Sequence, residues 1–156
     1  MTKNDNYYYD IKKDISAYPD AWCYIIFGGR NTGKTYSSLR LSVEEKHIFV
    51  YAKRTIEDVK LICAGANDKS KVSKYNINLS PFKSLNRDLG WNIKPVIIYP
   101  GLGGFFECDI DNEPYGEPIG YIVAMSAITK FKGFDLSECD YLIFDEFVPK
   151  MFDRTI

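Results

Sequence analysis

Apolar residues in this chain gather in short continuous runs, which are separated by polar stretches containing glycine and proline. Each run is rich in β-branched or aromatic residues, a pattern that predicts a β-strand. The runs cover residues 21–27, 47–52, 95–100, 103–110, 118–126 and 138–148. The first, second and last runs lack polar alternation, which is typical of strands buried on both faces of a parallel sheet.

Two of the intervening segments have the signals of helices. Residues 33–45 follow the first run after a short glycine-containing segment, and residues 55–65 begin with a capping threonine and end at a glycine. Residues 67–84 are polar and basic, which predicts a loop with a helix starting near Ser80. The order of strands and helices therefore predicts an α/β fold.

We expect one domain with a mainly parallel central sheet, flanked by helices and carrying a β-hairpin insertion at 103–110. Its 156 residues are enough to bury a core. Residues 1–18 form a Tyr-rich N-terminal arm, and residues 21–156 form the core. Tyr7, Tyr8, Tyr9 and Tyr18 precede the first run, and either pack the arm on the domain or stack on a nucleotide base.

The net charge of −1 hides an uneven distribution of charged residues. Residues 69–94 carry six Lys or Arg and one acid, whereas residues 105–121 carry five acids and no base. A protein that binds nucleic acid over its whole surface is usually basic, so DNA contact here needs a local patch or an assembled ring. The polar start and the lack of a long apolar stretch predict a soluble cytoplasmic protein with no membrane contact.

The four cysteines have no CxxC spacing, and with one histidine they do not make a zinc site. We expect buried free thiols in a reducing compartment. Two of them, Cys23 and Cys139, fall in or beside predicted strands.

The segment from residue 28 to residue 35 reads GGRNTGKT, a full match to the phosphate-loop pattern GxxxxGK[ST]. Glycines allow backbone N–H groups to approach phosphate oxygens, and the following helix directs its positive end at them. Lys34 supplies a charge for the β- and γ-phosphates, and the hydroxyl of Thr35 is a ligand for Mg²⁺. The predicted nucleotide-binding residues are Gly28, Gly29, Arg30, Asn31, Thr32, Gly33, Lys34 and Thr35.

A second motif, YLIFDE at 141–146, places two acids after four mainly apolar strand residues. Asp145 is expected to hold the Mg²⁺ shell, through water. Glu146 follows at the same sheet edge and suits a general base that polarises the attacking water. The two motifs together predict hydrolysis of ATP with Mg²⁺ as cofactor. They resemble the additional-strand, catalytic-glutamate (ASCE) branch of P-loop ATPases.

A more specific resemblance rests on Arg30 inside the loop, on IFVYAKR at 48–54 and on the long stretch GYIVAMSAITKFKGFDLSECDYLIFDEFV at 120–148. On these residues the chain resembles the N-terminal ATPase domain of the DNA-packaging proteins of small, Picovirinae-type podophages. The resemblance implies a homomeric ring, expected to be a pentamer, at the portal of a procapsid in the cytoplasm of an infected bacterium. ATP hydrolysis there drives double-stranded DNA into the capsid.

The same resemblance implies catalytic roles for Lys34, Arg30 and Glu146, with Arg30 contacting the γ-phosphate or signalling to a neighbouring subunit. It also implies further strands and a nuclease-like domain after residue 156, so we expect weak or no activity from this stretch alone.

Basic residues are the candidates for contacts with DNA or with a neighbouring subunit. Lys53 and Arg54 end the second predicted strand, where a solvated strand end is an equal alternative. The other candidates form a basic loop, for which an ordinary soluble loop is the alternative: Lys69, Lys71 and Lys74. DNA contacts in such a motor go to phosphates, because it moves along any sequence.

Two other functions fit the loop and the DE strand. A P-loop nucleoside kinase is one, although its usual four-cysteine zinc site is not matched by the cysteine spacing here. A nucleotide-gated interaction domain without catalysis is the other. Phosphate transfer to a nucleoside distinguishes the first, and ATP binding without turnover the second.

Overall fold

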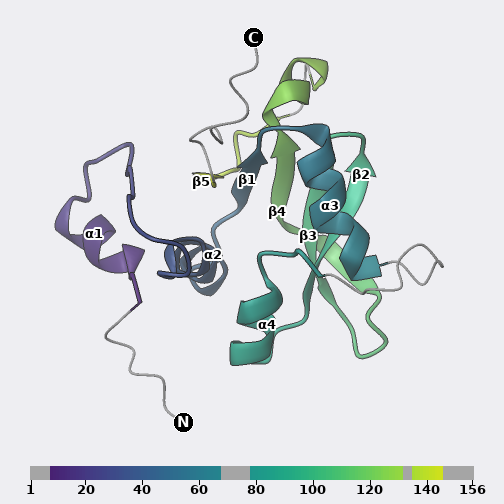
Figure 1. Ribbon diagram of the computed structural model, residues 1–156, viewed down its shortest axis with the longest axis horizontal. Coiled ribbons are helices and arrows are strands. Elements are labelled where there is room, and N and C mark those ends of the chain that lie inside the picture. The colour runs from purple at the N-terminus through teal and green to yellow at the C-terminus, as the bar shows by residue number, and fades with distance from the viewer. Residues whose placement is uncertain (1–7, 68–77, 132–134, 146–156) are drawn as a thin grey trace.

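The computed structural model describes residues 8–67, 78–131 and 135–145. Helices dominate the first half of this part of the chain, where β1 is the one strand, and strands dominate the second half (Figure 1). The elements are α1 (Ile11–Ala17), α2 (Lys34–Glu44), β1 (Phe49–Lys53), α3 (Ile56–Asn67), α4 (Lys83–Leu89), β2 (Ile93–Tyr99), β3 (Leu102–Cys108), β4 (Pro114–Ala124), the 3-10 helix η2 (Met125–Lys130) and β5 (Tyr141–Phe144). The α/β class predicted from the sequence is therefore confirmed.

The strands form one five-stranded sheet in the order β2-β3-β4-β1-β5. β1 pairs in parallel with β4 and with β5, whereas β3 pairs antiparallel with β2 and β4. Short connections join β2 to β3 and β3 to β4, and connections this short permit only antiparallel pairing. The expected hairpin is thus present, but the sheet is mixed. The parallel-dominated sheet of a P-loop fold stays a prediction.

β1 is the central parallel strand and is buried on both faces, as its continuous apolar sequence predicted. Phe49 and Tyr51 belong to the main core, with Phe105 and residues of the helices. Val50 points to a smaller cluster on the opposite face. Phe49 pairs in register with Gly120 of β4, and a Cβ atom built at that glycine would lie 2.5 Å from Cζ of Phe49. The phenyl ring therefore occupies the space of a missing side chain.

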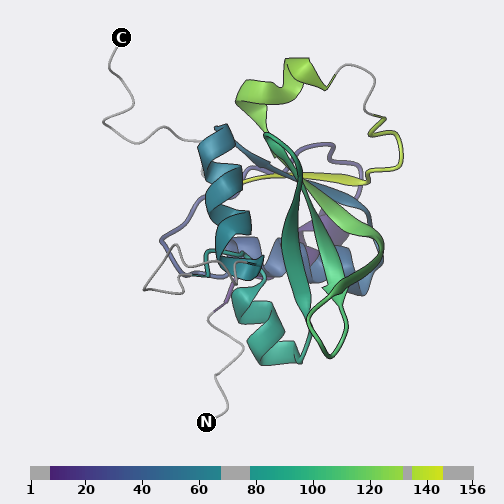
Figure 2. The ribbon, with the colours of Figure 1, turned by 90° about the vertical axis from the view of Figure 1, so that its right-hand side faces the viewer.

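Helices α3 and α4 lie on the same side of β2, β3 and β4 (Figure 2). α3 begins at a reciprocal cap, in which the Thr55 hydroxyl accepts from the Asp58 N–H and Asp58 Oδ2 accepts from the Thr55 N–H. The predicted cap residue is correct. The predicted stop at Gly65 is wrong, because the helix continues to Asn67.

The first apolar run, residues 21–27, is not a strand. Three of its large side chains are exposed: Trp22 (94%), Ile25 (64%) and Phe27 (79%). The segment is tied to the end of α1, where the Tyr24 hydroxyl and the Ala21 N–H both donate to the Tyr18 carbonyl. An apolar run becomes a strand only when it reaches a sheet edge that satisfies its backbone groups. These local bonds hold it to the helix instead.

The four cysteines are free thiols, as expected, but they are not all buried. Cys63 and Cys108 are buried, Cys139 is half-buried and Cys23 is exposed, because it lies in the run that did not join the sheet. Among the described residues, no helix is long and apolar enough to cross a membrane.

Candidate functional site

The phosphate-loop segment leads directly into α2. Gly33 caps the helix with φ +88°, a left-handed conformation that glycine adopts without strain. The Ser37 N–H donates to the Gly33 carbonyl at 2.8 Å, which closes the first helical turn. Gly28 to Asn31 are exposed, and Thr32 to Thr35 are half-buried. The loop therefore presents its first half to solvent.

Lys34 folds its side chain back over the loop. Its Nζ donates to the carbonyl oxygens of Gly28 (2.9 Å) and Gly29 (2.6 Å) and to Thr32 Oγ1 (3.0 Å). The Thr32 hydroxyl in turn donates to the Gly29 carbonyl at 2.9 Å. The ammonium group is thus held among three oxygen acceptors at the mouth of the loop, where a phosphate group would offer stronger acceptors.

The N-terminal arm lies against the loop, which the sequence left as one of two alternatives. The Tyr9 N–H donates to the Thr32 carbonyl at 2.8 Å, and the Ile11 N–H donates to Ser37 Oγ at 2.8 Å. A Cβ atom built at Gly33 would lie 3.1 Å from Cδ1 of Tyr8. Tyr8 and the Tyr9 backbone therefore lie against the loop, whereas Tyr18 is 67% exposed and Tyr7 lies outside the described residues.

Tyr9 also has a side-chain partner within the arm. Its hydroxyl donates to Asp14 Oδ2 at 2.6 Å. Burial, followed by this hydrogen bond, raises the pKa of Tyr9 well above its usual value. The phenol therefore stays a protonated donor at any physiological pH, and the contact holds α1 to the residues that cross the loop.

Asp145 follows β5 and is held by two side chains from the neighbouring strand β1. The Tyr51 hydroxyl donates to Asp145 Oδ2 at 2.8 Å, and Lys53 Nζ lies 3.5 Å from the same oxygen. Lys53 Nζ is also 5.4 Å from the centre of the Tyr51 ring. The three side chains form one cluster at the carboxyl ends of β1 and β5, which run parallel. The cluster fixes Asp145 at the edge where the sequence placed it.

Tyr51 was not among the site residues predicted from the sequence, where it falls within a predicted buried strand. A signal was available, because Tyr51 and Lys53 are two positions apart at the end of a strand and so share a face. Lys53 was a candidate for contact with DNA or another subunit. Its side chain is 15% exposed and is paired with Asp145.

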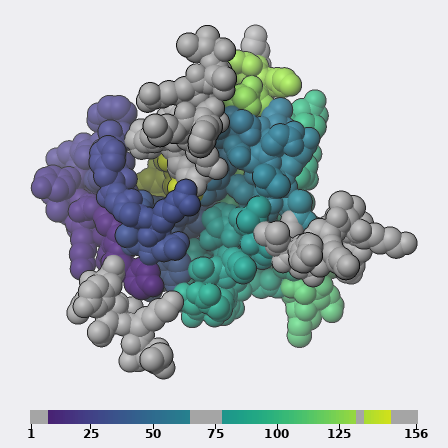
Figure 3. All heavy atoms as spheres, viewed as in Figure 1, coloured from purple at the N-terminus to yellow at the C-terminus, as the bar shows by residue number. Residues whose placement is uncertain are grey.

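The structure does not join the loop to the acidic cluster. Over residues 8–67, 78–131 and 135–145, no hydrogen bond or ion pair links residues 28–35 to Asp145. Figure 3 shows the dark-blue segment that contains the loop on the same face of the molecule as yellow atoms of the β5 region.

A Mg²⁺ ion would find oxygen donors here but no complete cage. Thr35 and Asp145 offer hydroxyl and carboxylate oxygens, which suit this hard cation. Within the described part of the chain, no group of three His, Cys, Asp or Glu side chains is placed to hold a metal. These two oxygen donors suit Mg²⁺ that arrives with phosphate oxygens of its own.

The structure describes some of the remaining predicted site residues and not others. Arg30 is exposed in the loop, and the Arg54 carbonyl accepts from the Ser126 N–H at 3.0 Å. Four predicted site residues lie outside the described residues: Lys69, Lys71, Lys74 and Glu146.

Comparison of the chain with protein-family models, with curated proteins and with solved structures gives no match.

Proposed function

We propose that the chain binds a nucleoside triphosphate with Mg²⁺ through the loop from Gly28 to Thr35. The observation that carries the proposal is the position of the Lys34 ammonium group, 2.6 to 3.0 Å from three oxygens of the loop. These acceptors are neutral, so charged phosphate oxygens would compete with them well. The N-terminus of α2 adds its partial positive charge at the same place.

A cavity close to the loop offers room for the rest of the nucleotide. A cavity of about 290 Å³ lies between α1 and the segment 21–26. Tyr9, Tyr18 and Tyr24 are among the residues that line it. Aromatic rings beside a phosphate loop suit a flat base, and the volume is near the lower limit of ordinary ligand pockets. The base would lie there and the phosphates at Lys34.

Hydrolysis is the reaction that we assign to this nucleotide. Mg²⁺, when bound with the phosphates, would neutralise charge that develops on the transferred group. Thr35 and Asp145 are the residues that would hold it, and Tyr51 and Lys53 keep the Asp145 carboxylate in position. Lys34 would stabilise the γ-phosphate oxygens. The base is assigned to Glu146, because it directly follows Asp145 in the sequence.

We further propose that this ATPase drives double-stranded DNA into a phage capsid as part of a homomeric ring. Support for this step is the sequence resemblance carried by Arg30 and by residues 48–54 and 120–148. Arg30 is exposed in the single chain and would therefore be accessible to a γ-phosphate or to a neighbouring subunit in such a ring.

The first experiment measures binding of a fluorescent ATP analogue to the full chain in the presence of Mg²⁺. Lys34→Ala should abolish binding, because the charge that faces the phosphates is lost. Lys60→Ala is the matched control, since Lys60 forms only an exposed ion pair with Glu57 on α3. Equal affinity of the Lys34→Ala and Lys60→Ala proteins would refute nucleotide binding at the loop.

The second experiment measures phosphate release with and without DNA. Glu146→Gln should bind the analogue normally and lose turnover. Binding without turnover in the unaltered protein, with DNA and with portal-bearing capsids, would favour a nucleotide-gated interaction domain. Transfer of phosphate to a nucleoside would favour a kinase.

A further inference from the structure

A second pocket lies at the far end of the hairpin strands and is not used by the proposed nucleotide site. It has a volume of about 110 Å³ and is lined by Val43, Trp91, Asn92, Ile93, Glu107, Cys108 and Tyr115. A space of this size admits the end of one polar side chain.

Glu107 occupies an unusual position in this pocket. It is two residues past Phe105, so both side chains lie on the same face of β3, and Phe105 is fully buried in the core. Across the strand pair, Glu107 stands opposite Ile93, which is buried as well. Glu107 itself is exposed, so its carboxylate lies at the solvent-facing rim of an apolar face.

An irregularity in the sheet brings Tyr115 to the same carboxylate. Phe105 pairs with Gly120, but Glu107 pairs with Tyr115, so residues 116–119 of β4 stand opposite Phe106 alone. Bulges of this kind redirect side chains. The Tyr115 hydroxyl donates to Glu107 Oε2 at 3.3 Å, and the charge of Glu107 is the main cause of the raised pKa of Tyr115.

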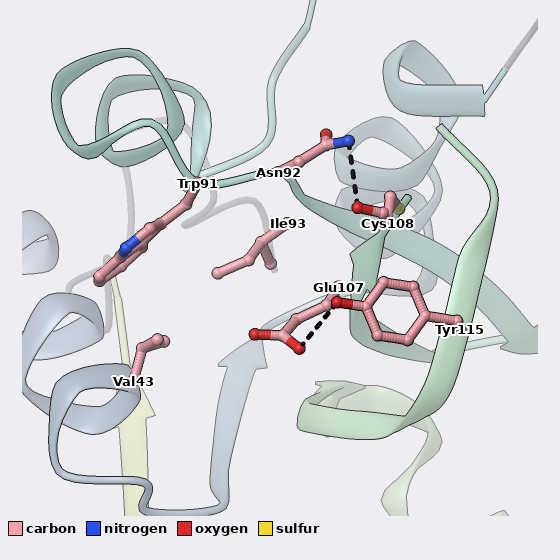
Figure 4. Close-up of a pocket in the computed structure, with 7 residues that line it drawn as sticks. All are labelled: Val43, Trp91, Asn92, Ile93, Glu107, Cys108 and Tyr115. Atoms are coloured by element: carbon pink, nitrogen blue, oxygen red, sulfur yellow. Dashed lines mark hydrogen bonds between the residues drawn. The ribbon is translucent and has the colours of Figure 1, made fainter. Parts of the chain in front are cut away.

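The other oxygen of Glu107 points toward Trp91 and Val43, which form the opposite side of the pocket (Figure 4). Trp91 is half-buried and packs against the main core, so its indole ring is held in place. An aromatic ring facing a carboxylate is suited to a cation, since the cation is attracted by both the ring and the negative charge.

The hairpin around the pocket is acidic throughout. Residues 105–121 carry Glu107, Asp109, Asp111, Glu113 and Glu117 and no Lys or Arg. In the part of the chain that the structure describes, none of these carboxylates forms an ion pair. The surface therefore has charge complementarity for a basic partner and repels nucleic acid.

Nearby cations of the chain do not neutralise the pocket. Arg40 on α2 is paired with Glu44, and Arg87 on α4 is paired with Asp88, each at 2.8 Å. Lys94 follows Ile93 in β2, so its side chain lies on one face of the sheet and that of Glu107 lies on the other.

The tip of the hairpin is held firmly next to the pocket. Asp109 Oδ1 accepts from the N–H groups of Asp111 and Glu113, each at 2.9 Å. The Asn92 amide donates to the carbonyls of Asp109 (2.9 Å) and Cys108 (3.3 Å). A ligand would therefore meet a site whose backbone is already ordered, which lowers the entropic cost of binding.

We propose that the pocket between Trp91 and Glu107 binds the guanidinium group of an arginine on a basic partner polypeptide. The planar guanidinium stacks on the Trp91 ring and donates hydrogen bonds to the open oxygen of Glu107. Its four heavy atoms fit the volume of the pocket, and Val43 contacts the side-chain methylenes. The surrounding carboxylates attract the basic residues on either side of the arginine.

The test uses the full chain with Trp22→Phe, which leaves Trp91 as its one tryptophan. The probes are the peptides acetyl-Gly-Arg-Gly-amide, its citrulline analogue and its lysine analogue. The arginine peptide should change Trp91 emission saturably, with a millimolar dissociation constant, because one such contact is weak in isolation. The citrulline peptide, which has the same shape and no charge, should bind at least tenfold more weakly.

Variants locate the site. Glu107→Gln should weaken binding of the arginine peptide about two- to fivefold, whereas Glu117→Gln removes the same charge from the hairpin outside the pocket and should have no measurable effect. No saturable change, or equal binding of arginine and citrulline peptides, would overturn the proposal. Equal binding of the lysine peptide would overturn the assignment to a guanidinium. Self-association lost in Glu107→Gln, measured by sedimentation, would identify a second copy as the arginine donor.

Discussion

The hydrogen bond from Tyr51 to Asp145 gives a direct test of the acidic cluster. Tyr51→Phe removes one hydroxyl from a side chain that is 2% exposed and keeps the ring in the core. A hydrogen bond to a charged group contributes about 1.5–3 kcal/mol to stability. Asp145 is 30% exposed, so water partly replaces the lost donor, and Lys53 stays 3.5 Å away. We therefore expect the free energy of unfolding to fall by about 1.5 kcal/mol, the lower end of that range.

The assay is urea unfolding followed by circular dichroism. With a slope of about 2 kcal/mol per M urea, the midpoint should move down by roughly 0.7 M. Tyr99→Phe is the control, because Tyr99 is exposed and its ring contact with Phe131 survives the change. A double-mutant cycle with Asp145→Asn should return a coupling energy of similar size. Identical midpoints for the Tyr51→Phe and Tyr99→Phe proteins would refute the reasoning.

Three further changes probe other features. Gly33→Ala should cost about 1–2 kcal/mol of folding free energy and weaken nucleotide binding, because φ at Gly33 is +88° and the Tyr8 side chain is near. Gly116→Ala, measured by urea unfolding in parallel, separates backbone strain from the clash with Tyr8, because Gly116 has φ +69° and no neighbour within 4 Å. Gly120→Ala should cost about 1–3 kcal/mol through its clash with Phe49, and Phe49→Leu in the same chain should recover part of the midpoint shift. Burial raises the pKa of Cys63 to about 12. Iodoacetamide at pH 8 should therefore label the exposed Cys23 and leave Cys63 unmodified, which mass spectrometry of the digested protein can measure. Because the native state favours the protonated thiol, Cys63 contributes its full share of folding stability below pH 9, and this share is lost as the pH rises toward 12. A Cys63→Ala protein that loses as much stability in alkali as the unaltered chain would contradict this prediction.

Local signals in the sequence predicted most of the elements. The cap at Thr55, the helix after Gly33 and the apolar runs at β1 and β5 depend on neighbours within a few residues. The run at 21–27 is as continuously apolar as the run that contains β1, but it remains outside the sheet. Strand formation also needs a partner edge, and apolar composition alone does not specify one.

The candidate site likewise combines features that depend on neighbouring residues with contacts between residues far apart in the sequence. The loop conformation follows from consecutive residues, and the sequence identified Lys34 and Gly33 without the structure. Tyr51 and Asp145 are 94 positions apart, so their contact depends on the parallel pairing of β1 with β5. The contact of the arm with Thr32 is likewise invisible in a pattern, because a backbone N–H donates it.

The packing of Phe49 into the space at Gly120 also constrains how this sequence can diverge. A larger residue at position 120 is compatible with the parallel pairing of β1 and β4 only if position 49 becomes smaller. The two positions should therefore vary together among relatives, with glycine opposite aromatic residues and larger side chains opposite Val or Ala. This reciprocal exchange is a marker by which distant relatives could be recognised when the overall identity has become too low to align.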